Sequence, residues 1–270
     1  MFKKNSLFLV RSEKYIQCKC IWLKLALLLV FFPFLNCASS MIKAVQAGDK
    51  EMIQKVLDDG GDINEYKFFY YTPIINAVID KNKEIVEFLI KKGADPNGRG
   101  SGNTGKNRLV STVYIAASLG DEEMVKLLLS NGADPNIRTE YAWMRTEFPY
   151  VTFREKGHPL RTIVETLKAY EDVLDNINTR EENKPKIKES YESYKISSSK
   201  IAEMLLSDKR VLSDSAVFAD VFPLYLGYGD DKITDKIFKS LPPNAISNEV
   251  FKVTINLKRS DYLQLLLTKG

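Results

Sequence analysis

The side chains that most often carry catalysis or bind metals are scarce in this chain of 270 residues. The only histidine is His158. The three cysteines all lie near the N-terminus: Cys18, Cys20 and Cys37. A metal site needs several such ligands close together, and a nucleophilic triad needs a histidine beside a nucleophile and an acid. The adjacent carboxylates Glu181 and Glu182 could suggest acid–base catalysis, but a solvated helix end accounts for them better. The sequence therefore predicts no catalytic residue, no metal site and no cofactor.

A glycine-rich string at Gly98–Gly102 has a spacing close to that of nucleotide-binding loops. Such loops follow a strand, and the Walker form ends in Lys followed by Ser or Thr. No strand is expected before this string, and no Lys-Ser or Lys-Thr pair follows at the required spacing. We therefore interpret Gly98–Val110 as a flexible, extended finger.

Aromatic residues gather in two other segments, Glu65–Tyr71 and Ile137–Gly157. Tyr and Trp are favoured in protein interfaces because they bring a large contact area with few rotatable bonds. The near-alternation in the second segment predicts a β-hairpin that turns around Glu147–Pro149. The residues predicted to bind a partner are Tyr66, Phe68, Tyr70, Tyr141, Trp143, Arg145, Tyr150 and Phe153. The alternative is that the aromatics of the first segment pack against the fold and that the second segment covers a repeat edge.

The elements that must position these segments form an internal repeat. Glu51–Asn64, Glu84–Asn97 and Glu123–Asn136 share one pattern, in which an apolar helical stretch leads to a glycine and then to Asp and Asn. A short apolar segment, such as Thr72–Val78, precedes each of them. Asn97 lies 33 residues after Asn64, and Asn136 lies 39 residues after Asn97.

These segments resemble the ankyrin repeat, with its T-P-L-H-x-A opening and its 33-residue period. The resemblance covers Ser39–Asn136 and implies an all-α ankyrin-repeat solenoid of helix-turn-helix units with β-hairpin-like fingers. It implies that Ala77 and Ala116 keep the inner helices thin, and that Gly93 and Gly132 end the outer helices with positive φ. It also implies that the concave face and the fingers bind another protein. Residues 37–136 are assigned to three well-matched repeats.

A degenerate fourth repeat is predicted within residues 137–213. His158-Pro159-Leu160 opens it, and Ile201–Leu206 lies in its outer helix. Between the two helices, Lys168–Lys200 inserts about thirty residues, into which the inner helix is expected to continue. The charged stretch Thr179–Ser190 contains Pro185 and is interpreted as a solvated turn. Two tyrosines of this insertion either join the binding surface or pack on the extended helix: Tyr191 and Tyr194.

Residues 214–270 are assigned to two further degenerate repeats. Phe222-Pro223-Leu224 is interpreted as the opening of the fifth, with its outer helix near Ile233–Leu241. Glu249–Gly270 is interpreted as the sixth, because its end, Tyr262–Gly270, mirrors Ile85–Gly93.

The N-terminus carries the positive charge of the chain. Six of the 39 basic residues but only one of the 35 acidic residues precede Cys37, so the remainder holds 33 basic and 34 acidic residues. A nucleic-acid partner is therefore not expected. The eleven apolar residues Leu25–Leu35 suit a secretory signal and are too few to span a membrane.

The segment around Cys37 resembles a bacterial lipoprotein signal, in which the cysteine receives a lipid and becomes the first residue. The preceding residue is usually small, whereas this chain has Asn36. Residues 1–36 are therefore predicted to be a lipoprotein-type signal peptide, and Cys37 the lipid attachment site. The alternatives are an uncleaved anchor or an ordinary secretory signal.

These features together predict a non-enzymatic lipoprotein that crosses the inner membrane, is held at a bacterial membrane on the periplasmic or cell-surface side, and binds another protein. The alternatives are a structural or regulatory envelope protein, or an enzyme with a site in the 137–213 insertions.

Overall fold

The computed structural model of the protein describes residues 40–66, 71–98, 100–101, 107–108, 110–139, 142–143, 152–153, 157–176 and 179–269. The chain divides into two compact parts, Met1–Ser40 and Met41–Gly270. All the described residues except Ser40 belong to the second part.

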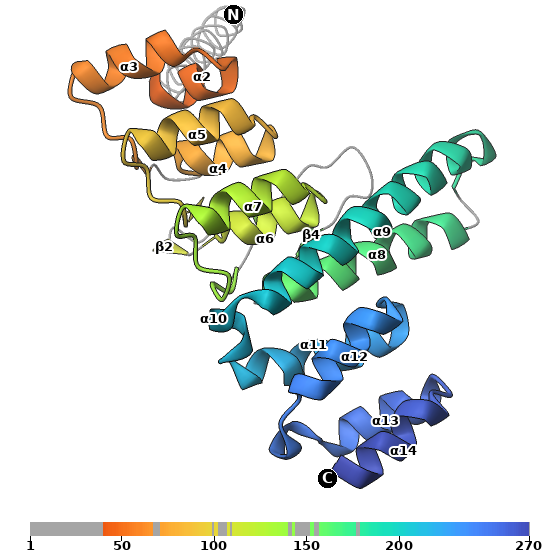
Figure 1. Ribbon diagram of the computed structural model, residues 1–270. Coiled ribbons are helices and arrows are strands. Elements are labelled where there is room, and N and C mark those ends of the chain that lie inside the picture. The colour runs from red at the N-terminus through yellow and green to blue at the C-terminus, as the bar shows by residue number, and fades with distance from the viewer. Residues whose placement is uncertain are drawn as a thin grey trace, which may run out of the picture. The chain divides into compact units, whose positions relative to one another are not determined.

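Six helix pairs follow one another along the described part of the chain (Figure 1). We number them as units one to six. They are α2 (Ser40–Ala47) with α3 (Lys50–Asp58), α4 (Pro73–Ile79) with α5 (Lys83–Lys91), α6 (Thr112–Ser118) with α7 (Glu122–Ser130), α8 (Pro159–Asp175) with α9 (Lys184–Ser207), α11 (Ser215–Tyr228) with α12 (Asp231–Ser240), and α13 (Asn248–Asn256) with α14 (Ser260–Lys269). The predicted all-α solenoid is confirmed.

Shorter elements lie between these pairs. They are β1 (Gly100–Ser101), β2 (Asn107–Arg108), β3 (Ala142–Trp143), β4 (Thr152–Phe153), the 3-10 turns η2 (Glu181–Asn183) and η3 (Pro243–Ala245), and the short helix α10 (Lys209–Leu212).

The first three outer helices begin in the same way. The side chains of Asp49, Asn82 and Asp121 each accept a hydrogen bond from the backbone N–H three residues later, at 2.8, 3.1 and 2.9 Å. Such N-caps satisfy one of the free N–H groups of the first helical turn. The caps fix where each outer helix starts and so keep its apolar stripe turned toward the core.

The turn between inner and outer helix is also repeated. One residue adopts a positive φ in units one, two, three and six: Gly48 (68°), Lys81 (53°), Gly120 (66°) and Lys258 (54°). The next backbone N–H then bonds to the carbonyl five residues earlier, at 2.9–3.1 Å in all four units. Unit six therefore has the same helix-turn-helix connection as the three well-matched repeats, although its sequence is degenerate.

The outer helices end as the sequence predicts. Gly93 and Gly132 have φ values of 94° and 87°, a conformation that favours glycine at a helix end. In the turn that follows, Asn64 Oδ1 accepts a hydrogen bond from Asp95 N at 2.8 Å, and Asn97 Oδ1 accepts one from Asp134 N at 2.7 Å. Each asparagine thus links the finger of its own unit to that of the next.

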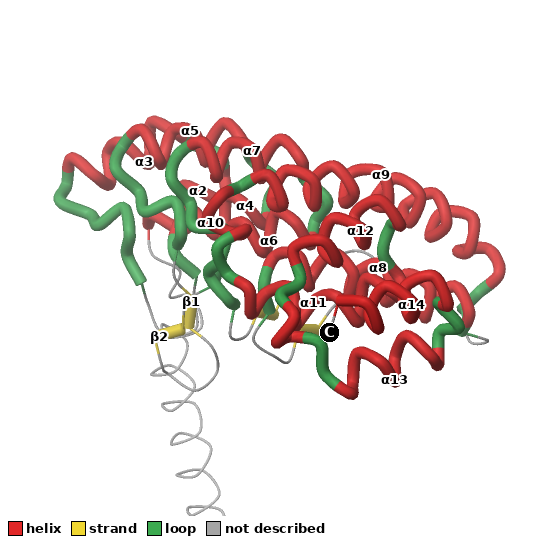
Figure 2. Tube along the Cα trace, turned by 60° about the horizontal axis from the view of Figure 1, so that its bottom comes forward, coloured by secondary structure: helices red, strands yellow, loops and turns green. Residues whose placement is uncertain are grey.

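The core runs along the stack between the helix layers. Ala77, Ala116 and Ala117 are fully buried, as expected where inner helices approach closely. The inner helices α4, α6, α8, α11 and α13 contact one another in that order. The outer helices α3, α5, α7 and α9 follow one another along one side in Figure 2. Successive layers therefore share a continuous apolar interior.

A row of ion pairs joins neighbouring units on the outer side. The pairs are Lys50–Glu84, Lys83–Glu123 (3.3 Å), Lys200–Glu122 (3.1 Å), Lys232–Glu203 (2.5 Å) and Arg259–Asp231 (3.0 Å). They are partly or largely exposed to solvent, so each contributes little to the stability of the fold. The row crosses every junction from unit one to unit six, which shows that the last three helix pairs continue the stacking of the first three.

Unit four has the longest helices of the stack (Figure 1). The inner helix α8 continues to Asp175, as predicted. The interpretation of Thr179–Ser190 as a solvated turn is wrong for most of its length, because α9 begins at Lys184. Pro185 lies in the first turn of α9, where its missing N–H would have no helical partner. The proline therefore starts a helix that it was expected to interrupt.

The two tyrosines of the insertion pack within the fold. Tyr194 is 6% exposed and donates a hydrogen bond to the Ala117 carbonyl at 3.0 Å. Tyr191 is half-buried and donates to Glu171 at 2.7 Å. Of the two alternatives for these residues, packing on the extension is the one observed.

The predicted opening of unit five at Phe222-Pro223-Leu224 is wrong. Helix α11 begins at Ser215, where the side chain of Asp214 accepts a hydrogen bond from Ala216 N at 3.1 Å, and Pro223 lies inside the helix. Val217 and Phe218 in the first turn are buried, so the helix gains its core contacts before the proline is reached. The proline removes one N–H donor and its ring crowds the carbonyl four residues earlier, so burial of the apolar residues must offset both effects.

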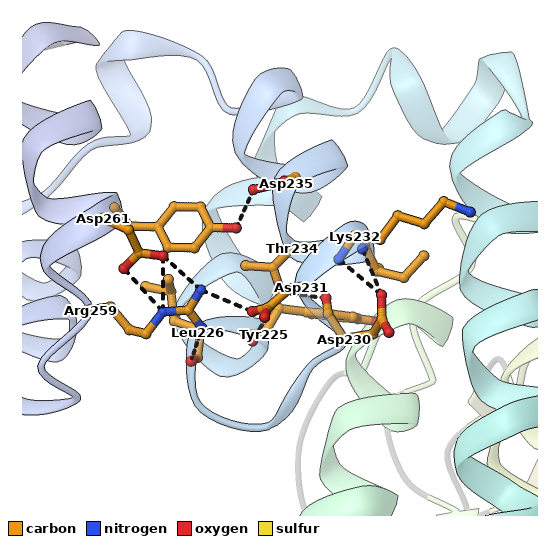
Figure 3. Close-up of polar contacts among 11 residues, drawn as sticks. Tyr225, Leu226, Asp230, Asp231, Lys232, Thr234, Asp235, Arg259 and Asp261 are labelled. Atoms are coloured by element: carbon orange, nitrogen blue, oxygen red, sulfur yellow. Dashed lines mark hydrogen bonds and ion pairs between the residues drawn. The ribbon is translucent and has the colours of Figure 1, made fainter.

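Arg259 joins units five and six (Figure 3). Its guanidinium pairs with Asp231 and Asp261 and donates to the Leu226 carbonyl at 3.4 Å. It also lies over the Tyr262 ring, 4.7 Å from the centroid, while the Tyr262 hydroxyl donates to Asp235. These contacts fix α14 against α12.

Candidate protein-binding surface

The finger between units three and four starts from a fixed base. Thr139 and Gly157 exchange two backbone hydrogen bonds of 2.9 Å each. The Thr139 hydroxyl, on a residue only 1% exposed, also accepts a hydrogen bond from Ser111 N at 3.0 Å. The two ends of the finger are therefore held together and bound to unit three.

Gly157 makes this base possible because it has no side chain. A Cβ at this position would lie 2.7 Å from Cε2 of Tyr114, which is closer than real carbon atoms approach. Tyr114 itself is fully buried. Its ring has little room to move away, so any larger residue at position 157 would force the base of the finger or unit three to shift.

Two strands continue outward from this base. Strands β3 and β4 pair antiparallel, with Ala142 opposite Phe153 and Trp143 opposite Thr152. This pairing confirms the hairpin that the alternating pattern predicts. It also brings two predicted binding residues, Trp143 and Phe153, onto neighbouring positions of one ladder.

The remaining predicted residues are placed less fully. Tyr66 is half-buried at the end of unit one. The others lie outside the described residues: Phe68, Tyr70, Tyr141, Arg145 and Tyr150, together with the lipid attachment site Cys37. The ladder carries Trp143 and Phe153 on paired strands, with Trp143 opposite Thr152 and Phe153 opposite Ala142. Their role in binding stays a prediction.

The finger between units two and three also contains a hairpin. Strands β1 and β2 pair antiparallel, with Gly100 opposite Arg108 and Ser101 opposite Asn107. This pairing agrees with the β-hairpin-like fingers that the resemblance to ankyrin repeats implies. Because Gly100–Ser101 belongs to a strand, the phosphate-loop interpretation, which needs the glycines to follow a strand and open a helix, stays rejected.

His158 has a structural role in the described fold. It is completely buried; its Nδ1 accepts a hydrogen bond from Leu160 N at 3.1 Å, and its Nε2 lies 3.3 Å from Asn136 Oδ1. Burial, aided by the charge of Arg138, lowers the pKa of His158 to about 3. Both ring nitrogens are occupied, so His158 caps α8 and is poorly suited to act as a general base.

An ion triad that the sequence did not reveal lies between units four and five. Arg161 of α8 pairs with Glu165 at 2.7 Å and with Asp220 of α11 at 2.8 Å. The side chains are 22–30% exposed, so the triad is a charged, partly accessible feature of the inner helices. The spacing of Arg161 and Glu165 is typical of a helical pair, but nothing in the sequence links them to a residue 59 positions away.

Across the described ranges, no group of three or more His, Cys, Asp or Glu residues could hold a metal ion. In the same part of the chain, every helix is too short or too polar to span a lipid bilayer.

In a comparison with known protein families, one family model matches the first three units. The sequence model for "Ankyrin repeats (3 copies)" matches residues 41–139. The resemblance to ankyrin repeats is thereby confirmed for this part of the chain.

Individual relatives match over short segments only. The 2-5A-dependent ribonuclease of Mus musculus is 44% identical over 62 residues, which are 23% of this chain and 8% of that protein. The mitochondrial disaggregase of Homo sapiens is 29% identical over 62 residues, 23% of this chain and 9% of that protein. The chain therefore matches less than a tenth of the length of these relatives, and the similarity concerns a repeat module rather than a whole enzyme.

Proposed function

We propose that this chain, in which residues 41–139 are ankyrin repeats, is a non-enzymatic lipoprotein of the bacterial envelope that binds another protein through the finger between units three and four. Stacked repeats of this kind offer extended surfaces for protein–protein interaction. The firmly held base of the finger, at Thr139 and Gly157, is the observation that carries the proposal.

A fixed base favours binding for a physical reason. A loop that is ordered before it meets its partner loses less conformational entropy on binding. The hairpin ladder above the base carries Trp143 and Phe153, and aromatic residues of this kind dominate the energetics of many interfaces. The finger is also longer than the regular one, and insertions in repeat proteins often lie on the binding face.

The proposed anchor rests on the sequence of the N-terminus. A basic segment, eleven apolar residues and Cys37 follow one another in the order of a lipoprotein signal. A lipid on Cys37 would hold the repeats at a membrane without any spanning helix.

Replacing Trp143 and Tyr150 with Ala is expected to abolish partner capture. The test is affinity purification with cross-linking from native membranes, followed by binding measurements with the purified partner. The affinity should fall by a factor of about 30 or more even if only one of the two aromatics is a hot spot, since a hot-spot residue contributes about 2 kcal/mol or more.

A matched control is Ile196→Ala. Ile196 is 64% exposed on α9 and lies outside the finger, so this variant should bind like the wild type. Circular dichroism must show that the double variant is folded. Equal capture by the wild type and a folded double variant would exclude the finger as the site. Failure to find any partner would favour the structural or enzymatic alternatives.

Replacing Cys37 with Ser is expected to abolish lipid attachment. Cells grown with an alkyne fatty acid should label the wild-type protein, and Cys18→Ser and Cys20→Ser variants should be labelled equally. Label on Cys37→Ser would contradict the proposed attachment site, and an unlabelled wild type would contradict the lipoprotein assignment.

A further inference from the structure

The finger between units three and four, which we call the long finger, is tied to unit four by side chains as well as by its backbone. Asn136 lies three residues before Thr139, at the near end of the finger. His158 directly follows Gly157, at the far end. Nε2 of His158 lies 3.3 Å from Oδ1 of Asn136. Because Nδ1 of His158 accepts a hydrogen bond from Leu160 N, Nε2 carries the proton of the neutral ring and donates to Asn136. A side-chain hydrogen bond therefore closes the finger beside its backbone pair.

Asn136 also contacts α10, the short helix that follows α9. Its Nδ2 donates a hydrogen bond to the Arg210 carbonyl at 2.8 Å. The Arg210 guanidinium in turn donates to the Ala133 carbonyl at 2.9 Å and is held by Asp208 at 2.7 Å. The amide of Asn136 thus joins the foot of the finger to both ends of unit four, to His158 before α8 and to Arg210 after α9. We call Asn136, His158 and Arg210 the lock.

The lock departs from the pattern of the preceding units. At the positions equivalent to Asn136, the side chains of Asn64 and Asn97 each accept a hydrogen bond from a backbone N–H of the next finger. In unit three the side-chain oxygen of Asn136 accepts from the ring of His158 instead. A contact that joins finger to finger in units one and two therefore joins a finger to the helices of unit four, and it does so at the finger that carries Trp143.

Contacts on two sides constrain the finger more than contacts on one side. The hydrogen bond from Ser111 N to the Thr139 hydroxyl holds the base to unit three. The lock holds the same base to unit four. With both in place, the finger cannot turn about its backbone pair without breaking a side-chain contact. A loop that is held in one direction loses less conformational entropy when it meets its partner.

We infer that the lock sets the direction of the long finger, and that Asn136 is a positioning residue for the binding of the partner. Asn136 acts through the finger, seven residues before Trp143, and needs no contact with the partner. The binding part of this inference rests on the proposed function, whereas the positioning part rests on the contacts of the lock alone. The finger leaves the stack from unit three, and unit four fixes its direction.

The test measures how freely Trp143 moves in the full-length protein in mild detergent. Trp22→Phe leaves Trp143 as the only tryptophan of the chain. In this background, Asn136→Ala should add a fast component to the decay of the fluorescence anisotropy of Trp143. Hydrogen exchange at the Thr139 and Gly157 amides should become about tenfold faster, because a contact that keeps the base closed is lost.

Asn64→Ala is the matched control, since it removes the equivalent side-chain acceptor at another junction. It should leave the motion of Trp143 and the exchange at the base as in the wild type. A second variant, His158→Asn, separates the lock from the helix cap. It keeps an acceptor for Leu160 N but loses the contact with Asn136, so it should also loosen Trp143. Circular dichroism should show that each variant is folded.

The binding part is tested with the partner purified by affinity capture from native membranes. Asn136→Ala should weaken its binding about tenfold, the effect of a finger that holds the binding direction for about a tenth of the time. Unchanged motion of Trp143 in folded Asn136→Ala and His158→Asn variants, or equal loosening by Asn64→Ala, would overturn the lock.

Two further outcomes separate the inference from the proposed function. A loosened finger that binds the partner with the affinity of the wild type would overturn the positioning role of Asn136. If the variant without Trp143 and Tyr150 still captures the partner, the proposed function fails, and the anisotropy and exchange measurements on Asn136→Ala still decide whether the lock sets the direction of the finger.

Discussion

Replacing Tyr194 with Ala is expected to lower the free energy of unfolding by about 3–5 kcal/mol, the range found when a large buried aromatic side chain is truncated. Tyr194 lies on α9, but its hydroxyl donates to the Ala117 carbonyl of unit three, and its ring lies 5.9 Å from that of Tyr170. The variant would leave a cavity where units three and four meet. Urea unfolding followed by circular dichroism measures the effect.

The matched control is Tyr194→Phe, which keeps the ring and removes only the hydroxyl. It should cost about 1 kcal/mol for the lost hydrogen bond. If both variants are as stable as the wild type, Tyr194 does not hold unit four to unit three. Partner capture should be unaffected by Tyr194→Phe, since the side chain is buried.

The stability of the protein is expected to fall in acid because His158 is buried without charge. Its pKa is about 3 in the folded protein against 6.5 as the ordinary value, so the unfolded chain binds a proton more readily. The contribution of His158 is therefore fully present above pH 6.5 and is lost as the pH falls toward 3. The loss is about 2 kcal/mol at pH 5 and about 3 kcal/mol at pH 4.

Carboxylates also titrate in acid, so the contribution of His158 must be measured as the difference in the free energy of unfolding between the wild type and a variant without this histidine. His158→Asn keeps an acceptor for Leu160 N but has no titrating ring. It should be about 1 kcal/mol less stable than the wild type at pH 7, because the contact with Asn136 is lost. Below pH 5 it should equal or exceed the stability of the wild type. Parallel stability profiles for the two proteins would show that His158 does not titrate on unfolding.

The sequence predicts most of the fold because its repeats are governed by local rules. Gly93 and Gly132 end outer helices, and a proline at the first helical turn opens α4 and α8. The alternation in Ile137–Gly157 predicts the β3–β4 pairing for a similar reason, since side-chain period follows backbone geometry.

The wrong predictions concern prolines in degenerate units. Pro223 resembles the proline of a repeat opening, yet it lies inside α11 because burial of the apolar residues before it outweighs one lost hydrogen bond. Pro185 resembles a helix breaker, but it occupies the first turn of α9, where proline is favoured. A proline has the same local effect in both cases, and tertiary packing decides whether the helix begins at the proline or continues through it.

The candidate site was predictable only in part. The position of the finger and its aromatic residues follow from the repeat period and from composition. The base of the finger could not be predicted from the sequence. The hydrogen bond from Ser111 to Thr139 joins residues 28 positions apart, and the fit of Gly157 against Tyr114 joins residues 43 positions apart. The pairing of Arg161 with Asp220 was hidden for the same reason.

The central place of unit four has a consequence for cooperativity. In a stack where each layer contacts only its neighbours, stability is close to a sum of the layers and their junctions. Helices α8 and α9 contact α6 and α7 on one side and α11 and α12 on the other. Local melting of unit four would therefore remove two junctions at once and leave two short blocks that must stand alone. Unfolding of the two halves is coupled through this layer, so the longest helices of the protein also set whether it unfolds as one body or as two.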